Sequence, residues 1–426
     1  MLHPSLIYRI MPAPLRLQDY PVASHTAPRH AVKDGWHIPK RLRSILSLDD
    51  FEQAARNHLP APIFAYVHGG CETDRGLRNN ADAFSDYDWV PRVFVSTATR
   101  TLSTTLFGEE WAAPIGIAPM GISALSAYRG DIVQTQAAAA TNIPAILSAT
   151  SLIRLEDVIA ANPRAWFQAY VPGEPERINA LLDRVATAGY KTLVVTADLP
   201  VSGNRENNIR AGFSTPLRPS LRLAWDGLKH PRWLVGTALK TLMRHGMPYF
   251  ENSHATRGAP IIASNVMRDF GARDHLNWEH LQQIREKWKG RLIIKGILSQ
   301  DDALLAKQFG ADGIIVSNHG GRQLDGAISP LRALPGIVRA VGPDYPVMID
   351  GGFRRGSDVL MALALGAKFV FVGRPFNYAG TIGGVEGVTH AIGILATEMA
   401  RNMALLGVNT PAELGSKHLQ KRSSNP

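Results

Sequence analysis

His319 and Arg322 stand three residues apart in the segment Ser317-Asn-His-Gly-Gly-Arg322, and Asp198 and Arg205 form a second group upstream. A histidine that an aspartate orients can take or give a proton near neutral pH. Two arginines can hold a carboxylate through paired, charge-assisted hydrogen bonds. Each residue alone would more often be structural or solvated, but together they predict acid–base chemistry on a small carboxylic acid.

Two glycine-rich segments, Asp350-Gly-Gly-Phe-Arg-Arg-Gly356 and Val372-Gly-Arg-Pro375, predict a site for a phosphate-bearing ligand. Backbone N–H groups exposed at such turns, a helix N-terminus and arginine side chains all bind phosphate oxygens. The alternative is that these glycines serve only tight turns. A metal site is not expected, because the chain has no H-E-x-x-H motif or dense carboxylate cluster, and serine hydrolase chemistry lacks its G-x-S-x-G turn.

Eight short apolar runs precede these polar residues, and helical segments fill the gaps between the runs. Strands that alternate with helices pair in parallel, and eight such units are the number that closes a barrel. We therefore expect an α/β fold, a (β/α)8 TIM barrel; an open doubly wound sheet is the alternative, less favoured because no G-x-G-x-x-G follows any run. The predicted strands are residues 115–118, 145–148, 166–169, 192–196, 292–295, 313–317, 347–350 and 369–372.

The active site of such a barrel lies at the carboxyl ends of the strands. Residues that directly follow the runs should therefore converge at one mouth of the barrel. In chain order they include Pro119, Met120, Gly121, Ser148, Thr150, Gln168, Tyr170, Thr196, Asp198, Lys295, His319, Asp350, Gly352, Arg354, Gly373 and Arg374.

The chain divides into an irregular N-terminal arm over residues 1–46, a barrel domain over 47–418 and a C-terminal tail over 419–426. A capping-box-like start at Ser47 opens a helical N-terminal extension of the barrel, which should end before Pro60. The spacing between the fourth and fifth runs far exceeds the others, which predicts a long insertion over residues 203–275. Residues 215–250 hold six basic residues and one acid, Asp226, so they carry +5 of the chain's net charge of +10.

Large apolar residues alternate with the basic ones in the 215–250 segment, as in a helix that lies on an anionic membrane surface. Packing on the barrel or on another subunit is the equal alternative. Nucleic-acid binding is not expected, because the chain has no recognition motif. The single Cys71 cannot form an internal disulfide, and no apolar stretch reaches the length of a membrane-spanning helix.

The motifs resemble those of the FMN-dependent L-2-hydroxy acid oxidase and dehydrogenase family, which includes glycolate oxidase, lactate dehydrogenase of the flavocytochrome type and bacterial mandelate dehydrogenase. The similarity spans about residues 47–418 and is strongest in residues 317–325 and 350–356. Residues 59–70 and 167–170 resemble the two segments of the family that carry its substrate tyrosines. The resemblance implies an FMN-binding barrel that oxidises a small L-2-hydroxy acid to the 2-oxo acid.

The resemblance also implies catalytic roles. His319 would remove a proton from the substrate, and Asp198 would orient the imidazole; the hydrogen on carbon could leave as a proton or as a hydride. Lys295 would lie beside the flavin edge that becomes anionic on reduction. The implied substrate contacts are Tyr66, Gly121, Thr150, Tyr170, Arg205 and Arg322, with Tyr170 near the reacting oxygen.

Further residues would bind FMN by the same resemblance. Ser148, Gln168 and Thr196 would hydrogen-bond the ring, and backbone groups around Pro119 would line it. The ribityl and phosphate end would contact Gly352, Arg354, Gly373 and Arg374, and the remaining expected contacts are Met120, Gly121, Ser317 and Asp350.

Two departures from the family pattern predict a larger substrate pocket. Thr150 replaces a large aromatic residue found in glycolate oxidase-like members, and Gly121 replaces a common alanine. We therefore expect lactate-like to mandelate-like acids, including longer or branched ones. The alternative of another class is an FMN-barrel isomerase.

The insertion, with its His230-Pro-Arg-Trp233, resembles the membrane-associated, quinone-linked members. This favours quinone as the electron acceptor over oxygen, whose use would make the protein a peroxide-producing oxidase. We expect a cytoplasmic protein, peripheral on the inner face of the cell membrane. A homo-oligomer, a tetramer, is also expected.

Overall fold

The computed structural model of the chain describes residues 38–214, 217–218, 220–263 and 273–422. Most of the expected N-terminal arm, a few residues of the 215–250 segment and residues 264–272 lie outside this description. Within the described residues no helix is both long and apolar enough to cross a membrane.

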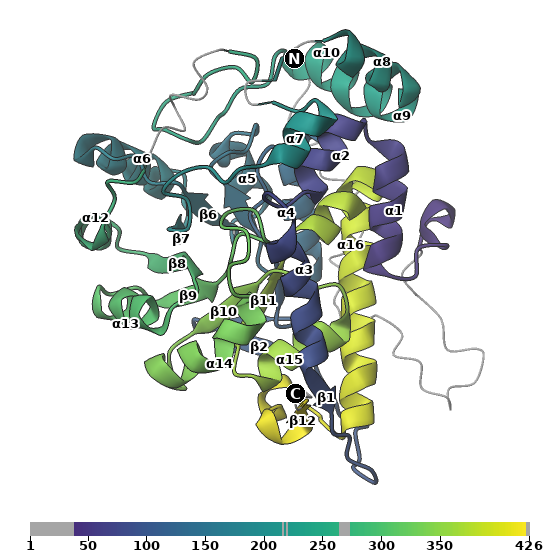
Figure 1. Cartoon of the computed structure of the whole chain (residues 1–426), viewed down its shortest axis with the longest axis vertical. Coiled ribbons are helices and arrows are strands. Elements are labelled where there is room, and N and C mark those ends of the chain that lie inside the picture. Colours follow the sequence, from purple (N-terminus) through teal and green to yellow (C-terminus); the bar gives the residue numbers. More distant parts are fainter. Residues whose placement is uncertain (1–37, 215–216, 219, 264–272, 423–426) are drawn as a thin grey trace, which may run out of the picture.

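Eight parallel strands form the centre of the molecule, as predicted, with bounds within two residues of the expected ones (Figure 1). Neighbouring strands pair in the order β4-β11-β10-β9-β8-β7-β6-β5, and a parallel bridge between Ile117 and Ala145 joins the two ends of the sheet. The sheet is thus a closed barrel. Its strands are β4 (Ile115–Ile117), β5 (Ile146–Ser148), β6 (Trp166–Ala169), β7 (Thr192–Thr196), β8 (Arg291–Ile297), β9 (Gly313–Val316), β10 (Val347–Asp350) and β11 (Phe369–Val372).

Each strand is followed by a helix that packs on the outside of the barrel. Because both faces of the strands are covered, the strands are continuous apolar runs, which is why the sequence revealed them. Glycine at 384, with φ of +59°, interrupts the last helix. The helices are α4 (Gly130–Thr141), α5 (Leu155–Ala161), α6 (Pro175–Thr187), α12 (Trp278–Lys287), α13 (Gln300–Gln308), α14 (Pro330–Val341), α15 (Gly356–Ala364) and α16 (Arg374–Leu406).

The barrel interior is filled by large side chains, among them Trp166, Met348 and Phe371, all at most 2% exposed. A hairpin that the sequence analysis did not predict packs against these residues. It consists of β2 (Thr104–Leu106) and β3 (Glu109–Trp111), joined by a turn in which Phe107 and Gly108 both have positive φ. Its Leu106 and Trp111 extend the interior cluster, so the hairpin helps to fill the barrel core.

The N-terminal extension begins with the predicted helix, α1 (Leu48–His58). Ser47 accepts a hydrogen bond from the Asp50 amide and Asp50 accepts one from the Ser47 amide, which confirms the capping box. Helix α1 packs along α16 (Figure 1). A 3-10 turn (Lys40–Leu42) precedes it, and α2 (Ala61–His68), α3 (Arg75–Asp82) and a further 3-10 turn (Ala83–Asp86) follow.

Two helices of the barrel have caps at their N-termini. Ser299 caps α13 through hydrogen bonds from the amides of Asp301 and Asp302. Helix α15 begins at Gly356, and Asp358 in its first turn accepts hydrogen bonds from the amides of Arg354 and Arg355.

Short elements lie between β4 and α4 and at the carboxyl end of the chain. A 3-10 turn (Ser123–Leu125) follows β4. At the other end, two more 3-10 turns (Pro411–Glu413 and Ser416–His418) lead into β12 (Leu419–Lys421), which pairs antiparallel with β1 (Tyr87–Trp89). The first residues of the expected C-terminal tail are therefore part of a two-stranded sheet.

The insertion leaves the barrel after β7 and forms helices at one end of the molecule (Figure 1). They are α7 (Glu206–Ala211), α8 (Leu221–Lys229), α9 (Pro231–Trp233), a π-helical turn (Leu234–Leu239) and α10 (Lys240–His245). Trp233 is buried, and its Nε1 donates to the carbonyl oxygen of Leu125 at 2.7 Å. Leu221 and Met243, by contrast, are 91% and 82% exposed. The segment therefore both packs on the barrel and presents apolar side chains to solvent.

Candidate active site

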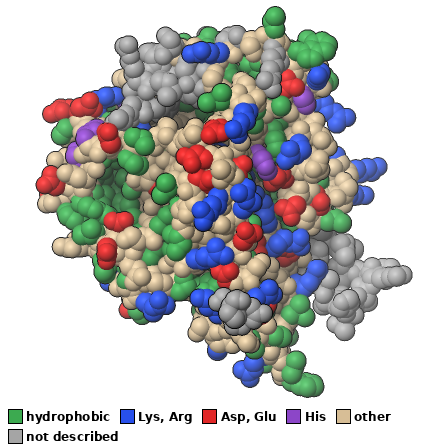
Figure 2. All heavy atoms as spheres, viewed as in Figure 1, with side chains coloured by type: hydrophobic (Ala, Val, Ile, Leu, Met, Phe, Trp, Pro, Cys, Tyr) green, Lys and Arg blue, Asp and Glu red, His purple; other side chains and the backbone are tan. Residues whose placement is uncertain are grey.

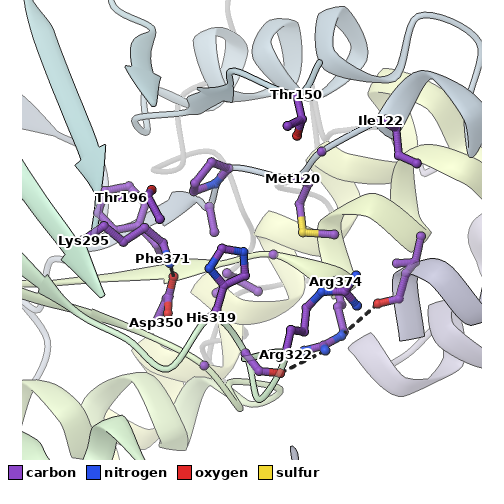
Figure 3. Close-up of a pocket in the computed structure, with 18 of the residues that line it drawn as sticks. Met120, Ile122, Thr150, Thr196, Lys295, His319, Arg322, Asp350, Phe371 and Arg374 are labelled. Atoms are coloured by element: carbon purple, nitrogen blue, oxygen red, sulfur yellow. Dashed lines mark hydrogen bonds and ion pairs between the residues drawn. The ribbon is translucent and has the colours of Figure 1, made fainter. Parts of the chain in front are cut away.

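A cavity opens at the carboxyl ends of the barrel strands. Its volume, including the open mouth, is about 1450 Å³, which leaves room for a flavin-sized ligand and a small substrate. Figure 3 shows the His319 imidazole between the Lys295–Asp350 pair and the guanidiniums of Arg322 and Arg374. The predicted residues that line the cavity are Tyr66, Pro119, Met120, Gly121, Thr150, Tyr170, Thr196, Arg205, Lys295, His319, Arg322, Asp350, Gly352, Arg354, Gly373 and Arg374.

Four predicted residues stand behind the lining rather than in it: Asp198, Ser148, Gln168 and Ser317. Each contacts a lining residue or its neighbour. Asp198 binds His319, Ser317 binds Lys295, and Ser148 binds both Gln168 and Thr150. The structure thus gathers all the predicted site residues at one mouth of the barrel.

His319 is held by its backbone and by Asp198. Its Nδ1 lies 2.9 Å from Asp198 Oδ1, so the hydrogen-bond network assigns the proton to Nδ1 and leaves Nε2 as an acceptor. Nε2 lies 3.5 Å from the Tyr170 hydroxyl. The φ of His319 is +58°, a left-handed conformation rare for a side chain of this size, and Gly320 and Gly321 continue it. The loop therefore fixes the imidazole in a defined orientation.

The electrostatic surroundings favour a neutral His319 imidazole. Burial lowers the pKa of His319 below its usual range, against the opposing effect of Asp198. Burial alone would raise the pKa of Asp198, but His319 and Lys295 outweigh it and keep that pKa low. A neutral imidazole whose Nδ1–H binds a carboxylate is ready to accept a proton at Nε2.

Three arginines gather around this histidine. Arg322 donates to the Gly69 carbonyl at 2.6 Å, Arg205 donates to Gln323 at 3.1 Å, and Arg374 donates to the carbonyls of Val67 and Gly320 at 2.9 Å each. Among the described residues, none of the three guanidiniums forms an ion pair. Burial and the charges of the other two arginines lower the pKa of Arg322 to about 9. Such uncompensated, partly buried positive charge predicts an anionic ligand.

Lys295 is the cation on the other side of His319. It is 4% exposed, and its Nζ lies 2.9 Å from Asp350 Oδ2 and 2.8 Å from Ser317 Oγ. Burial alone would lower the pKa of Lys295, but Asp350 and Asp198 raise it above its usual value. The ammonium group is therefore a fixed positive charge at the cavity wall.

Two buried polar atoms at neighbouring strand ends lack a hydrogen-bond partner among the described residues: Gln168 Nε2 and Thr196 Oγ1. Buried polar groups are nearly always satisfied, so these two predict a polar ligand that reaches them. The Gln168 oxygen is already used by Ser148 at 3.1 Å, which leaves its nitrogen as a donor. A planar ring with carbonyl and nitrogen acceptors fits this arrangement.

Arg354 marks the opposite end of the cavity, beside the start of α15. Its guanidinium lies 3.6 Å from Glu52 and 3.7 Å from Asp49, both on α1. Gly352 has φ of +91°, and a side chain there would meet the Asn80 carbonyl at 2.5 Å. This glycine therefore allows the close approach of two backbones at the expected phosphate end.

Gly121, Thr150 and Tyr66 meet at the cavity wall, where the sequence predicts substrate contacts. A Cβ atom on Gly121 would lie 2.3 Å from Thr150 Oγ1 and 3.0 Å from the Tyr66 hydroxyl. The expectation that Gly121 enlarges the pocket gains a structural reason, because any side chain there must displace one of the two hydroxyls.

Several residues that line the cavity were not predicted from the sequence. Ile122, Leu199 and Gly320 directly follow predicted residues, and Ser202 lies four residues after Asp198, so a wider window after each strand would have found them. Phe250 had no such signal. It comes from the insertion and reaches the cavity only through the tertiary fold.

A sequence profile of the FMN-dependent dehydrogenase family matches residues 55–421. The chain belongs to this family. The match covers most of the chain and includes every site residue described above. FMN is accordingly the cofactor of this FMN-dependent dehydrogenase.

Relatives of this FMN-dependent dehydrogenase cover most of its length. The L-lactate dehydrogenase of Ectopseudomonas mendocina (strain ymp) is 40% identical over 376 residues, which are 87% of this chain and 98% of the relative. The L-lactate dehydrogenase of Xanthomonas campestris pv. campestris (strain 8004) is 39% identical over 381 residues, 88% of this chain and 97% of the relative.

Solved structures add a fold-level comparison. The monotopic membrane protein (S)-mandelate dehydrogenase superposes with a TM-score of 0.83 at 34% identity, over 89% of this chain and 100% of that one. A mandelate oxidase solved with benzoyl-formic acid has a TM-score of 0.72 at 32% identity, over 88% and 98% of the two chains.

The residues present fit FMN. The unpartnered Gln168 and Thr196 atoms suit a ring with polar edges, Lys295 is a fixed cation beside them, and the glycine turns with Arg354 suit a phosphate.

Proposed function

We propose that this FMN-dependent dehydrogenase oxidises a small L-2-hydroxy acid, lactate-like or mandelate-like, to the 2-oxo acid. The observation that carries the proposal is the group of three guanidiniums, Arg205, Arg322 and Arg374, which have no carboxylate partner among the described residues and surround a neutral histidine. A carboxylate substrate at Arg205 and Arg322, and the phosphate end of FMN at Arg374, would supply the missing negative charge. The names of the curated and structural relatives support the same class of substrate.

In this proposal each residue of the chain has a defined task. Arg205 and Arg322 bind the substrate carboxylate, with the Tyr66 hydroxyl as a further donor. His319 Nε2 takes a proton from the substrate, and Asp198 holds Nδ1 and stabilises the imidazolium that forms. Tyr170 hydrogen-bonds near the reacting oxygen. FMN, when bound, would accept the two electrons that the substrate carbon loses together with the substrate's second proton.

The cofactor contacts follow from position. Lys295 would lie at the edge of the ring that gains negative charge, which its fixed ammonium group stabilises. Gln168 and Thr196 would hydrogen-bond the ring with the atoms that lack partners. The ribityl and phosphate end of FMN would contact Gly352, Arg354, Gly373 and Arg374. Arg374 also donates three hydrogen bonds to backbone carbonyls.

The test is the absorbance spectrum of the protein loaded with FMN, recorded without oxygen before and after addition of L-lactate or L-mandelate. Bleaching of the flavin band by the L acid and not by the D acid would support the proposal. The absence of bleaching by any 2-hydroxy acid would contradict it and favour the FMN-barrel isomerase, which needs neither His319 nor paired arginines.

We further propose quinone as the electron acceptor and an anionic membrane surface as the partner of the insertion. Exposed apolar residues of α8 and α10, among them Leu221, Trp225 and Met243, support this proposal, as does the monotopic structural neighbour. Figure 2 shows apolar side chains at the upper end of the molecule, where Figure 1 places these helices. Turnover with a quinone analogue, compared with peroxide formation in air, tests the acceptor. The expected tetramer stays a prediction, as does the cytoplasmic, inner-membrane location.

A further inference from the structure

Phe250 is the one residue of the cavity wall that comes from the far part of the insertion. Between Arg205 and Lys295, no other described residue lines the cavity. Its side chain is 4% exposed and belongs to the main hydrophobic cluster. The insertion therefore contributes to the interior of the active site as well as to the surface of the molecule.

Hydrogen bonds hold the backbone of Phe250 through both its amide and its carbonyl group. The Phe250 amide donates to the Ala259 carbonyl at 3.1 Å, and the Gly258 amide donates to the Phe250 carbonyl at 2.9 Å. A Cβ atom at Gly258 would lie 2.6 Å from that carbonyl oxygen, so glycine is needed for this close pairing. These contacts form a short antiparallel ladder that presents the ring inward.

The residues after Phe250 attach this ladder to the loop that carries Thr150. The Glu251 amide donates to the Ser151 carbonyl at 3.2 Å, and the Asn252 side chain accepts from the Leu155 amide at 2.8 Å. Ser253 Oγ donates to the Ala149 carbonyl at 3.3 Å. The ring of Phe250 is therefore fixed relative to Thr150.

An arginine from the barrel completes this support. Arg184 on α6 donates to the backbone carbonyls of Glu251 and His254 at 2.8 and 3.0 Å, and it binds both carboxylate oxygens of Glu156. The Glu251 side chain, which is buried, accepts from Arg257 at 2.8 Å. Because the backbone on both sides of Phe250 is held by these hydrogen bonds, its ring forms a rigid part of the cavity wall.

The polar groups of the cavity already have tasks in the proposed function. Arg205, Arg322 and Tyr66 bind the substrate carboxylate, His319 and Tyr170 act at the reacting oxygen, and Lys295 contacts the ring of the cofactor. The substituent on the substrate carbon still needs an apolar contact. Phe250 and Leu199 are apolar side chains of the wall. The segment after Phe250 binds the loop that carries Thr150, and Leu199 directly follows Asp198, which binds His319.

We propose that Phe250 is a specificity-determining residue that contacts the side chain of the 2-hydroxy acid and favours bulky apolar substituents over a methyl group. The proposal rests on the proposed function, since it assigns the substrate side chain of that same reaction. Apolar contact of this kind discriminates substrates by roughly tenfold or more.

The experiment compares kcat/KM for a series of L-2-hydroxy acids, from lactate through 2-hydroxybutyrate to mandelate, in the FMN-loaded wild type and in Phe250→Ala and Phe250→Leu. We expect Phe250→Ala to lower the ratio of the bulkiest to the smallest oxidised acid about tenfold, and Phe250→Leu to lower it less. A ratio that stays within twofold of wild type, or that rises, would overturn the proposal.

Tyr249→Leu is the matched control, because Tyr249 is adjacent but lies under Arg257 and does not line the cavity. Its ratio should equal that of the wild type. FMN affinity and melting temperature, measured for every variant, identify a folding defect, and Phe250→Leu retains enough bulk to fold if Phe250→Ala does not. A wild type that oxidises no 2-hydroxy acid would contradict the proposed function itself, which separates the two failures.

Discussion

Asp226 Oδ2 accepts a hydrogen bond of 2.6 Å from the amide of Ala61, the first residue of α2. Asp226 lies on α8 of the insertion, and α2 carries Tyr66, which lines the cavity. No side chain of α2's own N-terminal segment caps this helix, because its N-cap residue is Pro60. The one acid of the basic 215–250 segment thus stabilises the start of a helix that contributes Tyr66 to the cavity wall.

Loss of this contact should affect both stability and substrate binding. We expect Asp226→Ala to destabilise the protein by about 1 kcal/mol, the usual value of a helix cap, and to raise KM a few-fold through Tyr66. Asp226→Asn keeps an acceptor and loses the charge, so its defects should be smaller. Thermal melting and steady-state kinetics measure both effects; unchanged KM in Asp226→Ala would show that α2 is held without this contact.

His319→Ala should retain FMN and lose nearly all reduction by substrate. The imidazole contacts Asp198 and Tyr170, but it makes no contact that holds the glycine turns at the expected phosphate end. Loss of a general base typically costs 10²–10⁴-fold in rate. Stopped-flow reduction and FMN binding measure the two properties, and reduction at the wild-type rate would refute the assignment of the base.

The pH dependence of substrate reduction should report His319. Burial lowers its pKa, so the neutral base persists as the pH falls below the usual histidine range, and the acid limb of the reduction rate should lie below pH ~6.5. Asp198 opposes this lowering. In Asp198→Asn the limb should therefore move to still lower pH, while the rate at the plateau falls because a neutral amide stabilises the imidazolium less than the carboxylate does. A limb that moves to higher pH in this variant would contradict the pairing.

Gly121→Ala should narrow the substrate side of the cavity. The added methyl group would overlap Thr150 Oγ1, which also hydrogen-bonds Ser148 at 3.0 Å and so cannot rotate freely. We expect kcat/KM to fall several-fold, with larger losses for bulkier acids. Thr150→Ala removes the overlapping hydroxyl, so the double variant should come within about twofold of Thr150→Ala alone. If the losses of kcat/KM in the two single variants simply add in the double variant, the loss in Gly121→Ala does not arise from overlap with the Thr150 hydroxyl.

The exposed apolar residues of the insertion should govern attachment to anionic vesicles. The double substitution Leu221→Ser and Met243→Ser removes two highly exposed apolar side chains and should weaken vesicle binding at least tenfold, at about 1–2 kcal/mol for each buried side chain. Leu405→Ser is the control, because Leu405 is 66% exposed at the carboxyl end of α16, away from α8 and α10 (Figure 1). Cosedimentation measures binding. Equal binding of the double variant and the wild type would leave these side chains without a membrane role.

The sequence by itself determined the barrel and the chemistry at its mouth. Its strands are buried on both faces, so each appears as a mostly apolar run, and many of the functional residues lie at the end of a run or shortly after it. Closure of a parallel barrel brings all carboxyl ends to one mouth, which is why Asp198 and His319, which follow β7 and β9, could be paired from the sequence.

Only the tertiary structure decided contacts that depend on non-local packing. Phe250 lines the cavity although nothing in its neighbourhood marks a strand end. The hairpin of β2 and β3, with its turn at residues 107–108, packs into the barrel core although each of its strands is only three residues long. The same holds for the insertion, where Trp233 is buried and Met243 is exposed. Local sequence records the burial that is periodic along one element, whereas contacts between distant segments arise from how those elements pack together.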